Sequence, residues 1–204
     1  MKPLPLQSIV IATSNTHKLA EIKSILGNQS RQILSLQDFP EIIPIAETGY
    51  TFQENALLKA RTVFEHTLLL SLADDSGLEV DALSGDPGII SARYAGKEHD
   101  YAANNRKLLK ELLQVPAGQR GAQFRCVVAI VGKGIEKIVE GIVRGHIIEE
   151  LRGTGGFGYD PLFIPEGYQK TYAELGEKIK NRISHRAIAF QKAKVVVEQL
   201  INNR

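Results

Sequence analysis

The chain has 204 residues, of which 43% are hydrophobic and 24% are charged, and its formal net charge is +2. These values fit one soluble domain with a sizeable core, and they argue against a nucleic-acid binder, which usually carries a strong basic excess. The apolar run from Ile9 to Ala12 is too short for a signal peptide or a membrane span, and the single cysteine, Cys126, cannot form a disulfide within the chain. We therefore expect a single domain over residues 1–204, located in the cytoplasm, with no membrane and no nucleic-acid partner.

The first half of the chain alternates between apolar runs typical of strands and amphipathic runs typical of helices. Residues 9–11 are consecutive apolar residues, and good N-cap residues follow them at 14–16. We expect, in order, a strand over 8–13, a helix over 17–26, a strand over 33–36, a loop over 40–49, a helix over 51–70, and a strand over 71–83 with an edge at 74–77.

The second half adds a hairpin and a closing helix. The tripeptide at 132–134, Gly-Lys-Gly, separates two apolar runs and is a hairpin signal. The expected order is a loop over 84–96, a helix over 101–113, strands over 123–131 and 135–148, a glycine-rich loop over 153–158, a short strand over 162–164 and a helix over 184–202. Alternating helices and strands of this kind predict an α/β fold with a mixed sheet.

The first strand-to-helix junction carries a run of polar residues: Thr13, Ser14, Asn15, Thr16, His17 and Lys18. Free backbone N–H groups and the dipole at a helix start attract anions, and Lys18 adds a full positive charge. The run has no glycine and is therefore not a Walker loop. It predicts contacts with phosphate or sugar oxygens, although an ordinary N-cap beside an exposed lysine would give the same pattern.

Asp74 and Asp75 are adjacent carboxylates at the expected strand edge. Such carboxylates repel each other unless a cation lies between them or one is protonated, and hard oxygen ligands suit Mg²⁺. A carboxylate that is not fully committed to the metal could also take a proton from an attacking water. Because Asp-Asp-Ser-Gly is also turn chemistry, a solvated turn would explain the same residues.

Two further groups have chemistry that a nucleotide site could use. Glu47, Glu54, Asn55 and Lys59 could neutralise a phosphate–metal cluster, or they could form a solvated helix face. The run from Gly153 to Pro161 holds four glycines and two aromatic residues. This composition indicates backbone that approaches a flat or crowded group and a ring that can stack on a base, or else a flexible connection.

Lys180, His185 and Arg186 lie around the expected helix start at Ser184. Basic residues are unfavourable beside the positive end of a helix dipole, so their presence indicates an electron-rich partner such as a carbonyl or a phosphate. Exposed basic residues remain the alternative. Together, these groups supply what a metal-dependent nucleotide hydrolase needs.

Six segments, in order along nearly the whole chain, resemble the inosine triphosphate pyrophosphatase family, whose members are also called dITP/XTP pyrophosphatases. The segments are 13–18, 51–60 (TFQENALLKA), 73–83 (ADDSGLEVDAL), 87–96 (PGIISARYAG), 153–161 and 184–186. The resemblance implies a long mixed sheet flanked by helices, two lobes with a central cleft, and a homodimer.

The resemblance also implies roles for single residues. Asp75 would be the proton acceptor and a Mg²⁺ ligand, supported by Asp74 and Lys59. The substrate would be bound by residues 13–18 and Ser76, and its nucleoside end by Phe157, Gly158, Tyr159, Asp160, Lys180, His185 and Arg186. Many bacterial relatives carry paired acids where this chain has Ala46 and Glu47. The first acid of that pair is the proposed metal ligand, and it is Ala46 here. Either Glu47 takes over by a small loop shift or a water fills the place, so we do not count Glu47 among the expected metal ligands.

The predicted activity is Mg²⁺-dependent hydrolysis of purine triphosphates that carry the wrong base, such as ITP, dITP and XTP, to monophosphate and pyrophosphate. A water deprotonated by Asp75 would attack the α-phosphorus, and Lys18 and Lys59 would stabilise the leaving pyrophosphate. One alternative is a septum-inhibitor-type (Maf-like) pyrophosphatase with another base preference, whose opening motif is usually richer in Ser, Pro and Arg. The other is a non-catalytic nucleotide- or RNA-binding module, against which the paired carboxylates argue because they repel phosphate without a metal.

Overall fold

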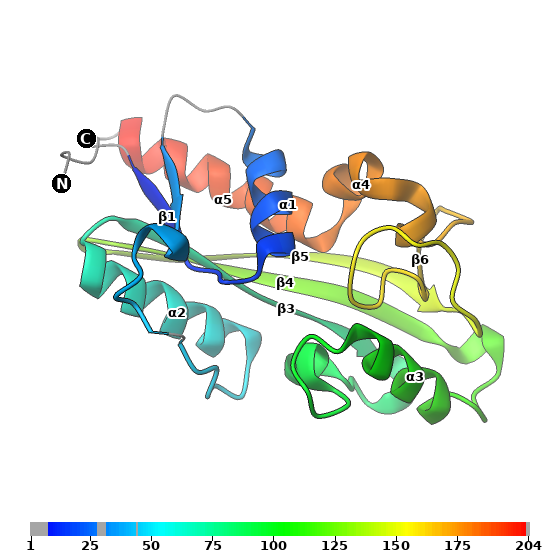
Figure 1. Ribbon diagram of the computed structural model, residues 1–204. Helices are drawn as coiled ribbons and strands as arrows, with labels where there is room; N and C mark the ends of the chain where they lie inside the picture. The colour runs from blue at the N-terminus through cyan, green and yellow to red at the C-terminus, as the bar shows by residue number, and fades with distance from the viewer. Residues whose placement is uncertain (1–7, 28–31, 44, 203–204) are drawn as a thin grey trace. The chain divides into compact units, whose positions relative to one another are not determined.

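The computed structural model describes residues 8–27, 32–43 and 45–202 (Figure 1). Six strands form one sheet in the order β2-β1-β3-β4-β5-β6. The strands are β1 (Ile9–Ile11), β2 (Ile33–Ser35), β3 (Leu70–Val80), β4 (Gly121–Gly132), β5 (Ile135–Ile147) and β6 (Phe163–Pro165). β1 pairs in parallel with β2 and β3, whereas β5 and β6 are antiparallel. The predicted α/β fold with a mixed sheet is confirmed.

Five α-helices lie between or after these strands within the described residues: α1 (Thr16–Leu26), α2 (Phe52–Thr67), α3 (Tyr101–Glu111), α4 (Tyr172–Ile183) and α5 (His185–Asn202). None of them is long and apolar enough to cross a membrane.

The chain divides into two compact units. Unit 1 comprises Met1–Asp75, Val127–Glu140 and Ala189–Arg204, and unit 2 comprises Ser76–Cys126 and Gly141–Ile188. The predicted single domain over 1–204 spans both units, and its residues 1–7 and 203–204 lie outside the described part.

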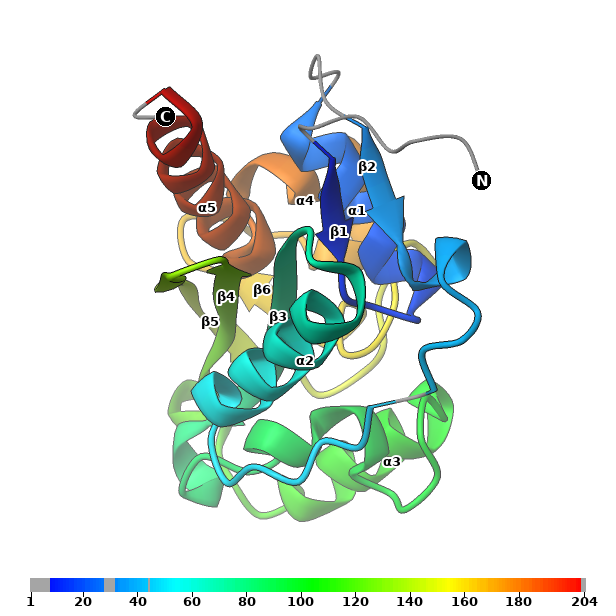
Figure 2. The same cartoon turned by 90° about the vertical axis from the view of Figure 1, so that its left-hand side faces the viewer.

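Unit 1 is organised around β1, which has a parallel partner on each side. Parallel neighbours require crossover connections, and α1 and α2 provide them. Helices α1 and α5 lie on one face of the unit's strands and α2 lies on the other (Figures 1 and 2). Because both faces are covered, β1 is an uninterrupted apolar strand, and its Val10 and Ile11 are 0% exposed.

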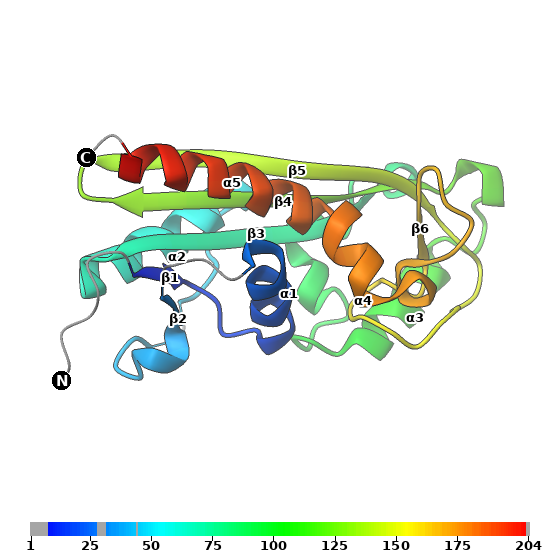
Figure 3. The same cartoon turned by 90° about the horizontal axis from the view of Figure 1, so that it is seen from above.

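Unit 2 has its own core around the remaining parts of β3, β4 and β5. Leu78, Leu108, Leu162 and Phe163 are fully buried in this core, and Phe124 meets Phe163 edge to face with ring centroids 4.8 Å apart. Helix α3 lies on one face of the unit's strands and α4 on the other (Figures 1 and 3). These two helices flank the glycine-rich loop that the sequence singled out. The single cysteine, Cys126, is buried and forms no disulfide.

Two elements differ from the sequence prediction. Leu70–Val80 is one continuous strand, so the predicted edge at 74–77 is wrong, and residues 81–83 form a short 3₁₀ turn rather than strand. Helix α4 was not predicted. Gly176 interrupts it with a left-handed φ of 75°, and this break hides the helical period. The capping box of Thr171 with Glu174 is the sequence signal that could have identified it.

Candidate active site

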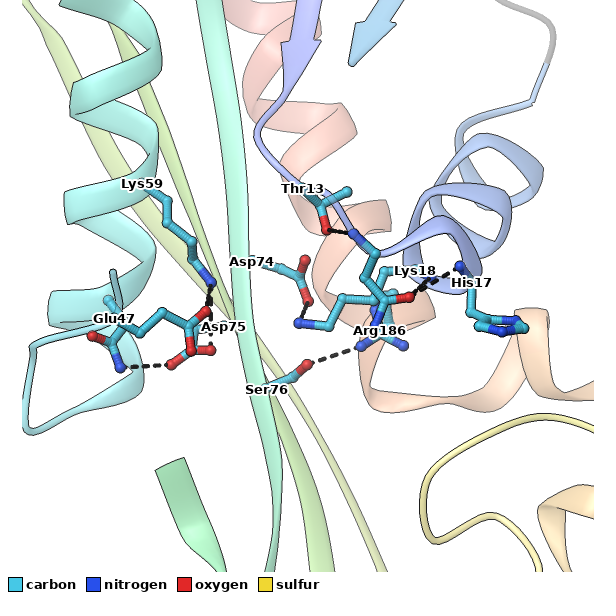
Figure 4. A network of polar contacts seen from close by, with 11 residues as sticks. Thr13, His17, Lys18, Glu47, Lys59, Asp74, Asp75, Ser76 and Arg186 are labelled. Carbon is cyan, nitrogen blue, oxygen red and sulfur yellow. Dashed lines mark hydrogen bonds and ion pairs between the residues drawn. The ribbon is translucent and has the colours of Figure 1, made fainter. Parts of the chain in front are cut away.

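Asp74 and Asp75 lie in the interior of β3, where successive side chains point to opposite faces of the sheet. Figure 4 shows Asp74 directed toward Lys18 and Asp75 directed toward Lys59. The two aspartates are only 2% and 4% exposed. A solvated turn is therefore excluded. The pair needs neither a cation between its members nor a shared proton to relieve direct repulsion, because the strand directs the carboxylates to opposite faces and each has its own lysine.

Helix α2 supplies the partners of Asp75 from two positions one turn apart. Lys59 Nζ lies 3.5 Å from Asp75 Oδ1 and 2.6 Å from Glu47 Oε1, so one lysine serves two carboxylates. The Asn55 Nδ2 donates to Asp75 Oδ2 at 3.1 Å, while Asn55 Oδ1 accepts from the Gly49 N–H at 2.8 Å. Asn55, which the sequence grouped with Lys59 but which received no role from the family resemblance, is 0% exposed and fixes the carboxylate plane of Asp75. Its signal was the four-residue spacing from Lys59.

The three charged groups of this cluster are not equivalent. Burial would lower the pKa of Lys59, but the charges of Asp75 and Glu47 outweigh it, so the lysine stays protonated. Burial would raise the pKa of Glu47, but the charge and hydrogen bond of Lys59 hold it below its usual value. The pKa of Asp75 is raised, because burial outweighs the more distant Lys59. Lys59 is thus committed mainly to Glu47, and Asp75 is the more basic carboxylate.

Glu54, which the sequence grouped with these residues, has a different task. It forms a capping box with Thr51 at the start of α2, and its Oε2 accepts from the N–H groups of Tyr50 and Thr51 at 2.7 and 3.2 Å. This arrangement satisfies backbone donors that would otherwise be unpaired at a helix start. Glu54 therefore positions α2, and through α2 it positions Asn55 and Lys59.

The first strand-to-helix junction is built as an N-cap. Asn15 Oδ1 accepts from the N–H groups of His17 and Lys18 at 3.0 and 3.1 Å, and Thr13 Oγ1 accepts from the Asn15 N–H at 3.2 Å. The expectation that these helix-start amides are free for an anion is wrong for His17 and Lys18, because Asn15 occupies them. The side chain of Lys18 remains accessible at 17% exposure, with Nζ 3.3 Å from Asp74 Oδ2. Ser14, Thr16 and His17 are exposed.

The glycines of the 153–158 loop are explained by crowding within unit 2. A Cβ on Gly153 or Gly155 would come within 2.8 Å of the Ala173 backbone in the first turn of α4, and one on Gly156 would clash with the Asp160 carboxylate. The crowded group that the sequence predicted is therefore α4 and Asp160 rather than a ligand. The loop is held against the helix by these close approaches, and Phe157 remains half-buried.

Asp160 and Lys180 anchor this loop through a buried ion pair. Lys180 Nζ lies 2.6 Å from Asp160 Oδ2, and both side chains are 3% exposed. The same carboxylate oxygen accepts from the Phe157 N–H at 2.8 Å. Lys180 Nζ also lies 4.4 Å from the centre of the Phe157 ring, in a cation–π arrangement. The lysine thus links the loop backbone and the aromatic ring.

His185 and Arg186 follow Ser184, whose Oγ accepts from the Ala187 N–H at 3.1 Å and caps α5 as predicted. The His185 ring stacks on Phe124 with centroids 4.6 Å apart and an interplanar angle of 8°. Arg186 Nη2 donates to Ser76 Oγ at 2.8 Å, and its guanidinium lies 5.7 Å from the Phe157 ring centre. Lys180, His185 and Arg186 are all buried, so the alternative interpretation as exposed basic residues is wrong.

Metal binding rests on the chemistry of the donor set around Asp75. Within the described part of the chain, no three His, Cys, Asp or Glu side chains are already gathered in the manner of a metal site. The oxygens of Asp75 and Glu47 are nevertheless hard ligands of the kind that Mg²⁺ prefers. Burial raises the pKa of Asp75, and a divalent cation would stabilise its charged form. The residues present therefore fit Mg²⁺. The structure is that of an α/β protein with buried lysine–carboxylate pairs suited to an anionic, metal-bound ligand.

Comparison with known proteins identifies the family. The profile of the Ham1 family matches residues 9–196. The chain is 48% identical over 195 residues to a dITP/XTP pyrophosphatase of Bacillus licheniformis, with 95% of this chain and 100% of the relative covered. A solved HAM1 protein from Coxiella burnetii has a TM-score of 0.86 at 40% identity, with 95% and 100% of the two chains covered. A nucleoside-triphosphatase / dITP/XTP pyrophosphatase from Mycobacterium abscessus has a TM-score of 0.75 at 43% identity, with 91% and 98% covered. The chain belongs to the Ham1 family, which confirms the resemblance predicted from the sequence.

Proposed function

We propose that this protein is a dITP/XTP pyrophosphatase that hydrolyses ITP, dITP and XTP to the nucleoside monophosphate and pyrophosphate. The proposal agrees with the name of the relative that is 48% identical over nearly the full length of both chains. Membership of the Ham1 family leaves no support for the Maf-like alternative. A non-catalytic binding module is disfavoured by the buried, basic carboxylate of Asp75.

The observation that carries the proposal is the state of Asp75. Its carboxylate is held in place by Asn55, and its burial raises its pKa although Lys59 and the Asn55 hydrogen bond act in the opposite direction. A carboxylate with a raised pKa is a better general base than an exposed one. We therefore assign Asp75 as the group that takes the proton from the attacking water.

The phosphate end of the substrate is assigned to Lys18 and Lys59. Lys18 is the more accessible of the two and can exchange its contact with Asp74 for a phosphate oxygen. Lys59 stays inside and keeps Glu47 and Asp75 in position. Mg²⁺, held by Asp75 and Glu47 when bound, would neutralise phosphate charge as the transition state forms.

The nucleoside end is assigned to the loop residues Phe157, Gly158, Tyr159 and Asp160, together with Ser76, Lys180, His185 and Arg186. The half-buried ring of Phe157 can stack on a base. Arg186 is fixed by its bond to Ser76, so its guanidinium can donate in a defined direction. Hypoxanthine and xanthine present an acceptor oxygen at C6, whereas adenine presents an amino donor there. The C6 amino group of adenine would therefore place a hydrogen-bond donor against the donors of the site.

A panel of ITP, XTP, GTP and ATP with Mg²⁺ and a pyrophosphate-release assay tests the proposal. One unpaired buried donor costs about 1–3 kcal/mol, so we expect kcat/KM for ITP and XTP to exceed that for ATP by about tenfold or more. Guanine shares the C6 oxygen and differs at C2 through its amino group, so GTP should be rejected there. Equal kcat/KM for ATP and ITP would favour a general nucleotide pyrophosphatase.

We also propose a homodimer and a cytoplasmic location, both from the family resemblance and from the nucleotide substrates. Size-exclusion chromatography with light scattering tests the first, and a monomer at assay concentration would contradict it. Cell fractionation tests the second.

A further inference from the structure

Helix α3 presents two residues to the loop that carries Phe157. The Asn105 Nδ2 donates to the Gly158 carbonyl at 3.0 Å. The Tyr101 ring lies 5.9 Å from the Phe157 ring, tilted by 43°. Because Tyr101 and Asn105 are four residues apart, they lie on the same face of α3. Neither residue was selected from the sequence.

Gly158 is the residue of this loop whose backbone orientation depends on a hydrogen bond from another element. Its neighbours are fixed, because the Phe157 N–H donates to Asp160 Oδ2 at 2.8 Å and the Tyr159 hydroxyl donates to the Ser91 carbonyl at 2.9 Å. Gly158 itself has a φ of 65°, and no atom lies within 4 Å of the place that a Cβ would take. A glycine in open space has little steric preference of its own. The direction of its carbonyl is therefore set by Asn105.

Stability alone does not explain an asparagine at this position. Asn105 is 5% exposed, and its Oδ1 accepts no hydrogen bond from the residues that the structure describes. A buried acceptor without a partner is unfavourable and calls for an explanation. The preceding residue, Asn104, shows the contrast: its amide accepts from the Ala95 N–H at 2.7 Å and donates to the Ser91 and Ala92 carbonyls.

We propose that Asn105 is a positioning residue for the nucleobase. It fixes the Gly158 peptide and, together with Tyr101, the orientation of the Phe157 ring. This inference rests on the proposed function, in which Phe157 stacks on the base. Asn105 acts through the loop, because its amide donor goes to the Gly158 carbonyl. Its removal should therefore weaken base binding and base discrimination while leaving the hydrolytic step unchanged.

Two variants of Asn105 separate the effect of losing its hydrogen-bond donor from the effect of losing its side-chain volume. Asn105→Leu removes the donor at similar size, and Asn105→Ala removes both. Lys107→Ala is the control, because it deletes another bond from a side chain of the same helix to a backbone carbonyl, from Lys107 Nζ to the Tyr94 carbonyl at 2.8 Å. All three proteins are first compared with the wild type by thermal unfolding, so that only folded enzyme is assayed.

The kinetic readout distinguishes positioning from general damage. We expect both Asn105 variants to raise the KM for ITP about tenfold, with kcat within about twofold of the wild type. The preference for ITP over GTP should fall by a similar factor. Inhibition by tripolyphosphate, which has no base, should be unchanged. A purely structural role would instead lower the apparent kcat for every substrate equally, and that result would overturn the proposal.

Amide hydrogen exchange of the ligand-free protein gives a readout that does not depend on activity. Peptides covering residues 153–160 should exchange about tenfold faster in Asn105→Leu and at the wild-type rate in Lys107→Ala. Unchanged exchange in both Asn105 variants, or faster exchange with an unchanged KM, would contradict the role. If the wild type fails to cleave ITP, the proposed function is wrong, and the exchange data still decide whether Asn105 orders the loop.

Discussion

Replacing Lys59 by methionine tests how the charges around Asp75 are balanced. Methionine keeps an unbranched side chain but removes the charge from a lysine that lies 2.6 Å from Glu47 and 3.5 Å from Asp75. The side chains of Lys59, Glu47 and Asp75 are only 10%, 24% and 5% exposed, so water screens the remaining carboxylates poorly. Breaking a buried pair from one side costs about 3–5 kcal/mol, which corresponds to a fall in Tm of about 6–20 °C for a protein of this size.

The loss of stability in Lys59→Met should become smaller as the pH falls. The raised pKa of Lys59 means that its contribution to stability is present across the neutral range and is lost only as the pH rises through the folded-state value. Glu47 has a lowered pKa, so its contribution is lost as the pH falls through its own folded-state value. In the variant, both carboxylates lose a positive neighbour and take up protons more readily. The Tm difference from the wild type should therefore be large at about pH 7 and small at about pH 4.

Thermal unfolding of the metal-free proteins, followed by circular dichroism, measures this difference. Arg61→Met is the control, because it also removes a positive charge from α2. The partner of Arg61, Glu136 at 2.8 Å, is exposed, so we expect little change in Tm. Adding Asp75→Asn to Lys59→Met should recover more stability than adding Glu47→Gln, because Asp75 is more deeply buried. A Lys59→Met protein that melts like the wild type at neutral pH would refute the reasoning, as would a Tm deficit that does not change with pH.

Two further substitutions test the assigned roles directly. Asp75→Asn keeps the shape of the side chain and should reduce kcat by about 10²–10⁴-fold in a protein that still folds, measured by pyrophosphate release. A folded Asp75→Asn enzyme with near-normal kcat would remove Asp75 from the chemical step. Lys18→Ala should weaken triphosphate binding by about 1.5–3 kcal/mol and monophosphate binding much less, measured by calorimetry. Equal losses for both ligands would mean that Lys18 does not contact the terminal phosphates.

The elements that the sequence predicted well are those with strong local signals. α1 begins beside Asn15 and ends at Gly27, α2 begins after Thr51, and α5 begins after Ser184, each at a capping residue that can be recognised without tertiary information. The hairpin of β4 and β5 was equally clear, because two glycines lie between two apolar runs. In these places local propensity and the final fold agree.

β3 is different because its local signals contradict its place in the fold. Asp-Asp-Ser-Gly is a sequence typical of turns, and all four residues lie inside an 11-residue strand. What permits this is long-range: α1 brings Lys18 to one face of β3, and α2 brings Asn55 and Lys59 to the other. No pattern within residues 70–80 contains that information. A place where tertiary contacts override propensity to bury charge is where a functional site is expected.

Lys59 and Lys18 also differ in how easily a phosphate can contact them. Lys59 is almost enclosed and is engaged by two acids, whereas Lys18 is 17% exposed and contacts the Asp74 carboxylate at a longer 3.3 Å. Lys18 is therefore open to a phosphate, but Asp74 repels that phosphate across a short distance. It follows that Lys18→Ala removes an attraction and also leaves the Asp74 charge less compensated. Adding Asp74→Asn to Lys18→Ala should restore part of the triphosphate affinity, and a double variant that binds no better than Lys18→Ala would show that Asp74 does not act on the substrate's charge.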